Sequence, residues 1–206
     1  MWIIYTVYQS LLHLFFPRSC FSCGKEGVAL CYTCINSTKR VLDTQPPYTM
    51  SIFNYKDQLI KRTLHAIKYY HRKDLLPPLA NVLVDKIVAE RYEGVLVPIP
   101  MPTIRMSMRG YNQASLLATI LSKGTRLMLR EDILVRSKSP ARQVTMNSKS
   151  SRLLNQKHTF KVTNNVVGLD IILVDDVTTT GATLNEARKI LLKHKAKSVT
   201  CVTLAH

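Results

Sequence analysis

Two neighbouring carboxylates stand at the end of an apolar run in the stretch IILVDDVTTTGAT, from Ile171 to Thr183. Like charges at the end of a buried strand disfavour folding unless a cation or a hydroxyl-rich ligand meets them. The loop after Asp175 and Asp176 carries several hydroxyls, and Gly181 permits close approach of a ligand to its backbone. Where such a loop opens a helix, its N–H groups and the helix dipole favour phosphate. The stretch therefore predicts a sugar-phosphate site, with a Mg²⁺ ion completing a polyphosphate end.

Four of the five cysteines form two CxxC pairs within the segment CFSCGKEGVALCYTC. The four residues are Cys20, Cys23, Cys31 and Cys34. Each CxxC turn directs two sulfurs to one point, and two such turns predict a tetrahedral zinc site. Four thiolates leave no open position for a water nucleophile, so we expect a structural role. The alternatives are two disulfides, which suit a chain without an export signal poorly, and a redox-active pair, which would explain only one CxxC.

The chain has 206 residues, of which 46% are hydrophobic, and a formal net charge of +16. This length predicts one domain with a small appendage. The charge favours polyanionic partners such as nucleic acid, phosphorylated small molecules or an anionic membrane surface, and the alternative is a solvated basic face. The segment from Arg136 to Lys161 has seven Lys or Arg residues and no carboxylate.

The N-terminal stretch WIIYTVYQSLLHLFF is apolar and uncharged. It is shorter than the roughly 20 apolar residues that a transmembrane helix needs, and it lacks the basic start and cleavage site of a signal peptide. We therefore expect no stable transmembrane segment and a cytoplasmic location. The stretch is interpreted as a helix packed on the protein itself, with peripheral membrane contact as the alternative.

Hydrophobic periodicity predicts strands that alternate with helices along the rest of the chain. The expected strands are 50–55, 94–100, 132–135, 171–174 and 198–206, and the expected helices are 57–70, 75–92, 112–124 and 181–195. This alternation is typical of an α/β domain with a mainly parallel sheet flanked by helices. A plausible linker at Pro46 and Pro47 divides the chain into a cysteine module, 1–45, and a larger domain, 46–206.

Four motifs in their order carry a family resemblance: the doubled CxxC, then VPIP, then RMSMRGYNQA from Arg105 to Ala114, then DDVTTTGAT. This order resembles the ComF/GntX family of competence-associated type I phosphoribosyltransferase-like proteins, over essentially the whole chain. IILVDDVTTTGAT by itself is similar to the phosphoribosyl-pyrophosphate signature of type I phosphoribosyltransferases. The resemblance implies a type I phosphoribosyltransferase fold with a small N-terminal zinc knuckle, and Mg²⁺-dependent binding of phosphoribosyl pyrophosphate.

The same resemblance implies roles for individual residues. Asp175 and Asp176 would hold the ribose 2- and 3-hydroxyls and stabilise positive charge at the anomeric carbon. Arg105 and Arg109 would neutralise the pyrophosphate. The 5-phosphate would lie on Thr178, Thr179, Thr180, Gly181, Ala182 and Thr183. The basic segment 136–161, with Arg136, Lys138, Arg142, Lys149 and Arg152, would be a hood over the site or a contact for single-stranded DNA.

One position departs from the purine-salvage relatives. They have an acidic residue where this chain has Thr179, so a hypoxanthine- or guanine-type acceptor is disfavoured. Two functions are open at this point. The first is phosphoribosyl transfer to an unidentified acceptor. The second is a non-catalytic nucleotide sensor or single-stranded-DNA-binding accessory protein, acting with the DNA-uptake machinery in natural transformation.

Overall fold

A computed structural model describes residues 18–41, 48–137 and 159–206 of the chain. Its main element is a five-stranded sheet in which every pairing is parallel. In spatial order the strands are β1 (Thr49–Phe53), β7 (Ser198–Ala205), β6 (Asp170–Val177), β2 (Val95–Pro98) and β3 (Met128–Leu129). The prediction of an α/β domain with a mainly parallel sheet is confirmed.

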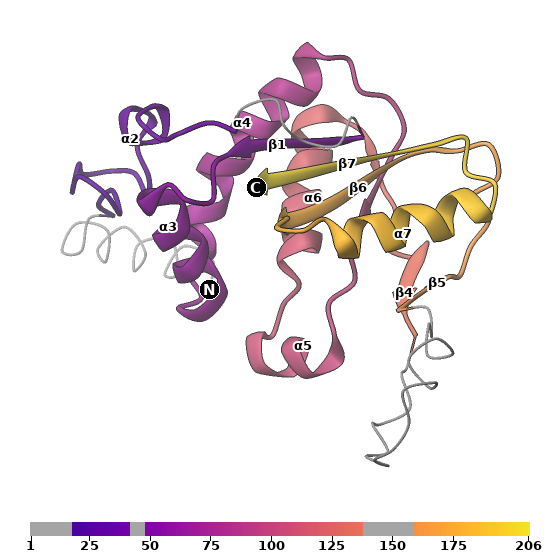
Figure 1. Cartoon of the computed structure of the whole chain (residues 1–206). Helices are drawn as coiled ribbons and strands as arrows, with labels where there is room; N and C mark the ends of the chain where they lie inside the picture. Colours follow the sequence, from indigo (N-terminus) through magenta and orange to yellow (C-terminus); the bar gives the residue numbers. More distant parts are fainter. Residues whose placement is uncertain (1–17, 42–47, 138–158) are drawn as a thin grey trace, which may run out of the picture.

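Helices cover both faces of this sheet (Figure 1). The helices are α2 (Tyr32–Asn36), α3 (Gln58–Tyr69), α4 (Leu76–Ala89), α5 (Thr103–Arg109), α6 (Gln113–Thr125) and α7 (Ala182–Lys193). Along β6, Ile172 and Val174 pack in one core cluster with α3, α4 and α6, whereas Ile171 and Leu173 pack in a second with α7. Burial on both faces explains why this strand is continuously apolar in sequence.

Side-chain caps and prolines mark the starts of three helices. The Asp57 side chain accepts hydrogen bonds from the first backbone N–H groups of α3, and Asn112 Oδ1 accepts one from the N–H of Ala114 at 3.1 Å. Two prolines, Pro77 and Pro78, lie in the first turn of α4, where no intrahelical donor is lost. The predicted starts of α3, α4 and α6 are therefore correct to within a residue.

Three local predictions differ from the structure. The segment after VPIP, for which no helix or strand is predicted from the sequence, contains the short helix α5. The strand expected at 132–135 is observed as β4 (Leu134–Arg136), which pairs antiparallel with β5 (Phe160–Val162) outside the main sheet. Helix α6 does not end at Gly124 but runs to Thr125. Gly124 serves a close contact instead, because a Cβ atom there would lie 2.7 Å from Cγ1 of Val84 on α4.

The cysteine segment packs on the helical layer. Leu30 and Ile35 are buried in the same core cluster as Leu64 of α3. The predicted N-terminal helix and the boundary between 45 and 46 fall on residues 1–17 and 42–47, which lie outside the described residues. The division into two domains therefore stays a prediction. Among the residues that the structure describes, no helix is both long and apolar enough to cross a membrane.

Candidate functional site

A cavity of about 280 Å³ opens at the carboxyl ends of β2 and β6, the end at which parallel α/β sheets bind ligands. Its polar lining side chains are Tyr55, Lys68, Arg105, Arg109, Asn112, Gln113, Arg136, Asp175, Asp176, Thr179 and Thr183. Six of the predicted site residues therefore meet in one cavity, although they come from two separate stretches of the sequence. Lys68 and Tyr55 also line it, and sequence reasoning missed both.

The two carboxylates, Asp175 and Asp176, lie at the carboxyl end of strand β6. Asp175 Oδ1 accepts a hydrogen bond from the N–H of Asp176 at 2.9 Å, and Asp176 Oδ1 accepts one from the N–H of Val177 at 2.8 Å. Burial, and next the negative charge of Asp176, raise the pKa of Asp175 to about 7. The Asp175 carboxyl therefore gains and loses its proton near neutral pH.

Lys68 supplies the cation that the sequence did not reveal. Its Nζ lies 2.9 Å from Asp176 Oδ2, and the two side chains are 20% and 15% exposed. The last turn of α3 that carries Lys68 is held by Tyr111, whose hydroxyl donates a hydrogen bond to the carbonyl of Ile67. The residue stands more than 100 positions before the aspartates, so nothing in the local pattern could have linked them.

The loop between β6 and α7 is placed as an anion site requires, but its residues are not equivalent. Gly181, with φ of 70°, is the N-cap of α7, which is 12 residues long. Thr179 and Thr183 line the cavity, whereas Thr178 is buried and its N–H donates to the carbonyl of Ala205 at 3.0 Å. The Thr178 side chain therefore belongs to the packing of the sheet edge. The remaining predicted loop residues, Thr180 and Ala182, are exposed beside the cavity.

Three guanidinium groups, those of Arg105, Arg109 and Arg136, also line the cavity. Arg136 Nε donates to the carbonyl of Pro100 at 2.9 Å, and its guanidinium lies 5.1 Å from the centre of the Phe160 ring. Burial, and next the charge of Arg105, lower the pKa of Arg136. Two cations that repel each other inside a cavity favour an anion between them.

Arg109, which was predicted from the sequence, is anchored by two side chains. Its Nη1 donates to Gln113 Oε1 at 2.9 Å, and its guanidinium lies 5.4 Å from the centre of the Tyr69 ring. Asn112 links this segment to Ile99, another lining residue of the cavity. Its Nδ2 donates a hydrogen bond to the carbonyl of Ile99 at 2.9 Å. Within five residues, the motif RGYNQ therefore caps α6, holds the Arg109 side chain in place and lines the cavity.

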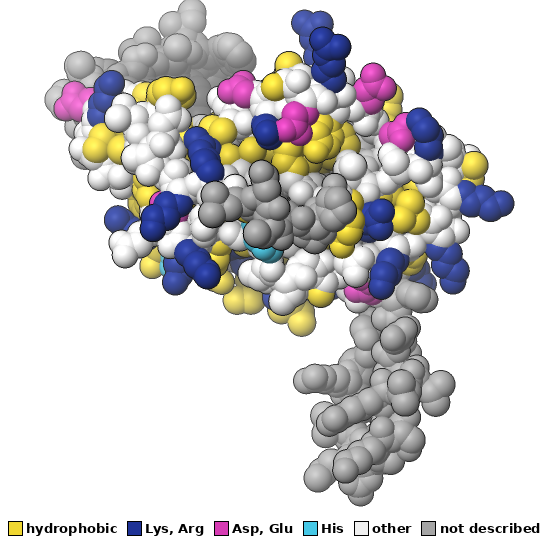
Figure 2. All heavy atoms as spheres, turned by 45° about the horizontal axis from the view of Figure 1, so that its top comes forward, with side chains coloured by type: hydrophobic (Ala, Val, Ile, Leu, Met, Phe, Trp, Pro, Cys, Tyr) yellow, Lys and Arg dark blue, Asp and Glu magenta, His cyan; other side chains and the backbone are white. Residues whose placement is uncertain are grey.

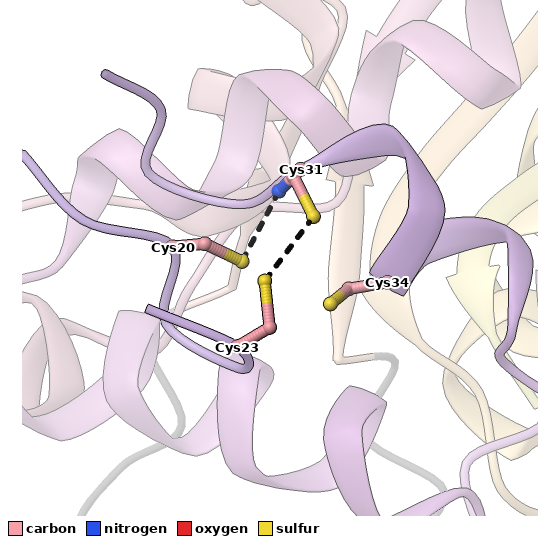
Figure 3. A group of neighbouring side chains, drawn as sticks. All are labelled: Cys20, Cys23, Cys31 and Cys34. Carbon is pink, nitrogen blue, oxygen red and sulfur yellow. Dashed lines mark hydrogen bonds between the residues drawn. The ribbon is translucent and has the colours of Figure 1, made fainter. Parts of the chain in front are cut away.

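The four cysteines of the two CxxC pairs converge on one point (Figure 3). Their sulfur atoms all lie within 4.8 Å of one another, and the Sγ atoms of Cys23 and Cys31 are 3.6 Å apart. These spacings and the donor set fit a four-thiolate metal site, for which Zn–S bonds of about 2.3 Å are typical. The four cysteines could therefore hold a metal ion.

The thiol of Cys20 is already prepared for a cation. Burial raises the pKa of Cys20, but backbone N–H groups of Cys23, Cys31 and Ser22 outweigh burial and hold this pKa at about 6. One of these donors is the N–H of Cys31, which lies 3.3 Å from Cys20 Sγ. Backbone donors of this kind around metal thiolates stabilise the bound form. The fifth cysteine, Cys201, is fully buried in the second core cluster, away from this group.

On the face in Figure 2, the Lys and Arg side chains of the described residues occur at several separate places and form no single patch, with acidic side chains near some of them. Within the predicted basic segment 136–161, only Arg136, Ser137 and residues 159–161 are described, and Lys138, Arg142, Lys149 and Arg152 lie outside the described residues. The hood and the DNA contact predicted for this segment therefore stay predictions.

Comparisons with known proteins agree with this geometry. A family model described as "Phosphoribosyl transferase domain" matches residues 106–206. Competence protein ComFC of Bacillus subtilis is 32% identical over 192 residues, which cover 90% of this chain and 76% of that protein. DNA utilization protein YhgH of Salmonella typhimurium is 29% identical over 168 residues, covering 78% of this chain and 73% of the relative. Competence protein F of Haemophilus influenzae is 38% identical over 145 residues, which cover 68% of this chain and 59% of that protein.

The parallel sheet, the matched domain and the cavity at its carboxyl edge define a protein with the type I phosphoribosyltransferase fold. The N-terminal cysteine cluster is compatible with a zinc knuckle appended to that fold. The chain belongs to the ComF family of phosphoribosyltransferase-like proteins.

Proposed function

We propose that this protein binds phosphoribosyl pyrophosphate in the cavity at the end of β6 and transfers its phosphoribosyl group to a nucleophilic acceptor. The observation that carries the proposal is the union, in one cavity, of a carboxylate pair, the N-terminal loop of a helix and three guanidinium groups. Hydroxyl acceptors, a phosphate cradle and cations for a leaving pyrophosphate are the three parts that such a ligand needs.

In the proposed reaction, the bond between the anomeric carbon and the pyrophosphate oxygen breaks, and a bond from the acceptor to that carbon forms. Pyrophosphate leaves with the electron pair of the broken bond. Asp175 and Asp176 hold the ribose hydroxyls and stabilise the positive charge that develops on the ring. The loop from Thr179 to Thr183 holds the 5-phosphate, and Arg105 and Arg109 stabilise the departing pyrophosphate.

Two metals belong to the proposal. Carboxylate oxygens are the ligands that Mg²⁺ prefers, so Asp175 and Asp176 would hold it, where its charge would offset that of the pyrophosphate. Zinc would be held by the cysteine cluster (Figure 3), and with four thiolates it would act as a structural ion. Because Thr179 stands where purine-salvage enzymes have an acid, we propose an acceptor whose nitrogen is already nucleophilic rather than hypoxanthine or guanine.

The test is calorimetry of the purified protein with phosphoribosyl pyrophosphate and Mg²⁺, for the wild type and for Asp175→Asn. We expect the variant to bind the ligand at least about tenfold more weakly, since a charge-assisted hydrogen bond contributes roughly 1.5–3 kcal/mol. Asp170→Asn is a matched control, because Asp170 lies on the same strand but at its opposite end, paired with Lys197. Equal affinity in wild type and Asp175→Asn would remove Asp175 from the site.

The names of the relatives, Competence protein and DNA utilization protein, support a role for this chain in DNA uptake or use. They leave room for a second function, in which the cavity binds the nucleotide precursor as a signal and no transfer takes place. A pyrophosphate-release assay with a panel of nucleophilic acceptors separates the two. Ligand binding without release, with every acceptor, would favour the sensor; release with one acceptor would identify the enzyme.

A further inference from the structure

Of the four cations that line the cavity in the described part of the chain, only Lys68 forms an ion pair with a carboxylate. Its Nζ lies 2.9 Å from Oδ2 of Asp176. The other oxygen of this carboxylate, Oδ1, accepts a hydrogen bond from the N–H of Val177 at 2.8 Å. The ammonium of Lys68 therefore contacts the oxygen of Asp176 that does not bond to the backbone of its own strand.

The backbone of α3 beside Lys68 is held in place, whereas the lysine side chain is free to change its direction. The preceding residue, Ile67, is 1% exposed, and its carbonyl accepts a hydrogen bond from the Tyr111 hydroxyl. Lysine carries its charge on a flexible four-carbon stem. The ammonium can therefore leave Asp176 while α3 stays where it is.

The Lys68 ammonium lies where the proposed function requires a metal ion. Asp175 and Asp176 are the proposed ligands of Mg²⁺, and both line the cavity together with Lys68. In the empty cavity, a cation beside them offsets the repulsion between the two carboxylates. A divalent ion bound there would lie within a few ångströms of the ammonium, and positive charges at that separation repel each other. The ammonium and the metal ion are therefore alternative partners of Asp176.

We propose that Lys68 is an exchangeable counter-cation of the carboxylate pair. It neutralises Asp176 while the cavity is empty, and it is displaced when a divalent metal ion enters. A bare metal ion must displace the ammonium without compensation, whereas a metal ion that arrives with a diphosphate brings negative charge for the released ammonium to contact. Lys68 thus determines specificity, because it favours a metal–diphosphate complex over the metal ion alone. The inference rests on the proposed function, from which it takes Asp175 and Asp176 as the Mg²⁺ site.

The test measures binding of Mn²⁺, a paramagnetic substitute for Mg²⁺, to the full chain by electron paramagnetic resonance without any phosphate ligand. The cysteine cluster is first saturated with zinc, so that the probe is left to the cavity. We expect Lys68→Met to bind Mn²⁺ about tenfold or more tightly than the wild type, because the competing charge is gone. Lys68→Arg keeps the charge and should bind Mn²⁺ as the wild type does. A variant that loses its fold cannot produce this gain in affinity.

Three controls locate the effect. Lys197→Met breaks the exposed pair with Asp170 at the opposite end of β6 and should leave Mn²⁺ binding unchanged. Arg105→Met removes a cavity cation that has no carboxylate partner among the described residues, so its gain should be clearly smaller than that of Lys68→Met. Adding Asp176→Asn to Lys68→Met should abolish the gain, since the proposed metal ligand is then lost.

The exchange is overturned if Lys68→Met binds Mn²⁺ no more tightly than the wild type. It is also overturned if Arg105→Met gains as much, because the general field of the cavity would then be the cause. The titration is repeated with phosphoribosyl pyrophosphate, which should raise Mn²⁺ affinity more in the wild type than in Lys68→Met; an equal rise in both would overturn the selectivity.

The two proposals fail in different ways. If Lys68→Met gains Mn²⁺ affinity but neither protein binds phosphoribosyl pyrophosphate, the exchange is supported and the proposed function is wrong. If both proteins bind phosphoribosyl pyrophosphate and Mn²⁺ affinity is the same in both, the proposed function is supported and the exchange is wrong.

Discussion

At the scale of single residues, the cavity contains two carboxylates in different electrostatic situations. Asp176 is paired with Lys68, whereas the pKa of Asp175 is set by burial and by the charge of its neighbour. These situations predict opposite responses to mutation. Replacing Asp175 with a neutral residue should stabilise the protein, and removing the positive charge of Lys68 beside Asp176 should destabilise it.

The first prediction concerns the pH dependence of stability. Asp175 has a folded-state pKa of about 7, above its usual value of 3.8, so the native state binds more protons than the unfolded state between these limits. The free energy of unfolding contributed by Asp175 therefore falls as pH rises from about 4 to 7, by up to about 1.4 kcal/mol per unit, and is constant above. Asp175→Asn should remove this dependence. Denaturant unfolding at several pH values, with Asp170→Asn alongside, checks it; parallel wild-type and Asp175→Asn curves would contradict it.

The second prediction concerns Lys68. Lys68→Met leaves Asp176 unpaired in a side-chain position that is 15% exposed, so we expect the free energy of unfolding at pH 8 to fall by about 1–3 kcal/mol. Lys197→Met is the control, because Lys197 is 69% exposed in its pair with Asp170 and an exposed ion pair adds little to stability. Adding Asp176→Asn to Lys68→Met should recover most of the loss. No recovery in the double variant would show that the Lys68 stem, rather than its charge, is what matters.

At the scale of helices and strands, the sequence predicted where helices start better than where they end or which strands pair. The start of α6 follows from the Asn112 cap, and β6 from its continuous apolar run. Helix α5 was missed because it is short and has no buried residue, so no apolar period marks it. The assignment of β4 to a separate ribbon depends on its partner β5, which lies beyond residues 138–158 and had no sequence signal of its own. Lys68 is brought to the site only by tertiary packing, for which the sequence has no local signal.

The third prediction tests the close approach of α4 and α6. In Gly124→Ala the new methyl group meets Val84 Cγ1 at 2.7 Å, and the branched valine has little rotamer freedom to move away. Overpacking costs roughly 1–3 kcal/mol, and the better helix propensity of alanine returns about 1 kcal/mol, so we expect a net loss of about 1 kcal/mol. In a Val84→Ala background the same change should be neutral or stabilising. Additive effects in this double-mutant cycle would rule out the contact as the reason for the glycine.

At the scale of the whole molecule, the cysteine cluster is joined to the main fold through a shared core, since Leu30, Cys31 and Ile35 are buried with residues of α3 and α4. Loss of metal should therefore also lower the stability of the main fold. The residues that line the cavity also come from both halves of the chain, Tyr55 and Lys68 from one and the RGYNQ and DDVTTTGAT segments from the other. The family model, which begins at residue 106, covers only the second of these groups.

The fourth prediction is that the protein contains one zinc ion per chain. Elemental analysis should find it in the wild type and in Cys201→Ala, whose thiol is remote from the cluster, and should find it absent from the double variant Cys31→Ser with Cys34→Ser. Chelation should lower the melting temperature by several degrees, because metal binding contributes directly to the folding free energy. Unchanged metal content in the double variant would contradict the assignment.

The position of β7 has a consequence for how the protein is made. This strand is the last of the five in sequence, yet it lies between β1 and β6 and is paired with both (Figure 1). During synthesis β1 leaves the ribosome about 150 residues before the strand that it pairs with, at a rate of roughly 5–20 residues per second. The backbone edge of β1 has no strand partner in this sheet during that interval, whereas β6 precedes β7 by only about 20 residues, and the sheet becomes continuous only when β7 is inserted between them. We therefore expect the nascent chain to expose the unpaired edge of β1 until β7 has been made.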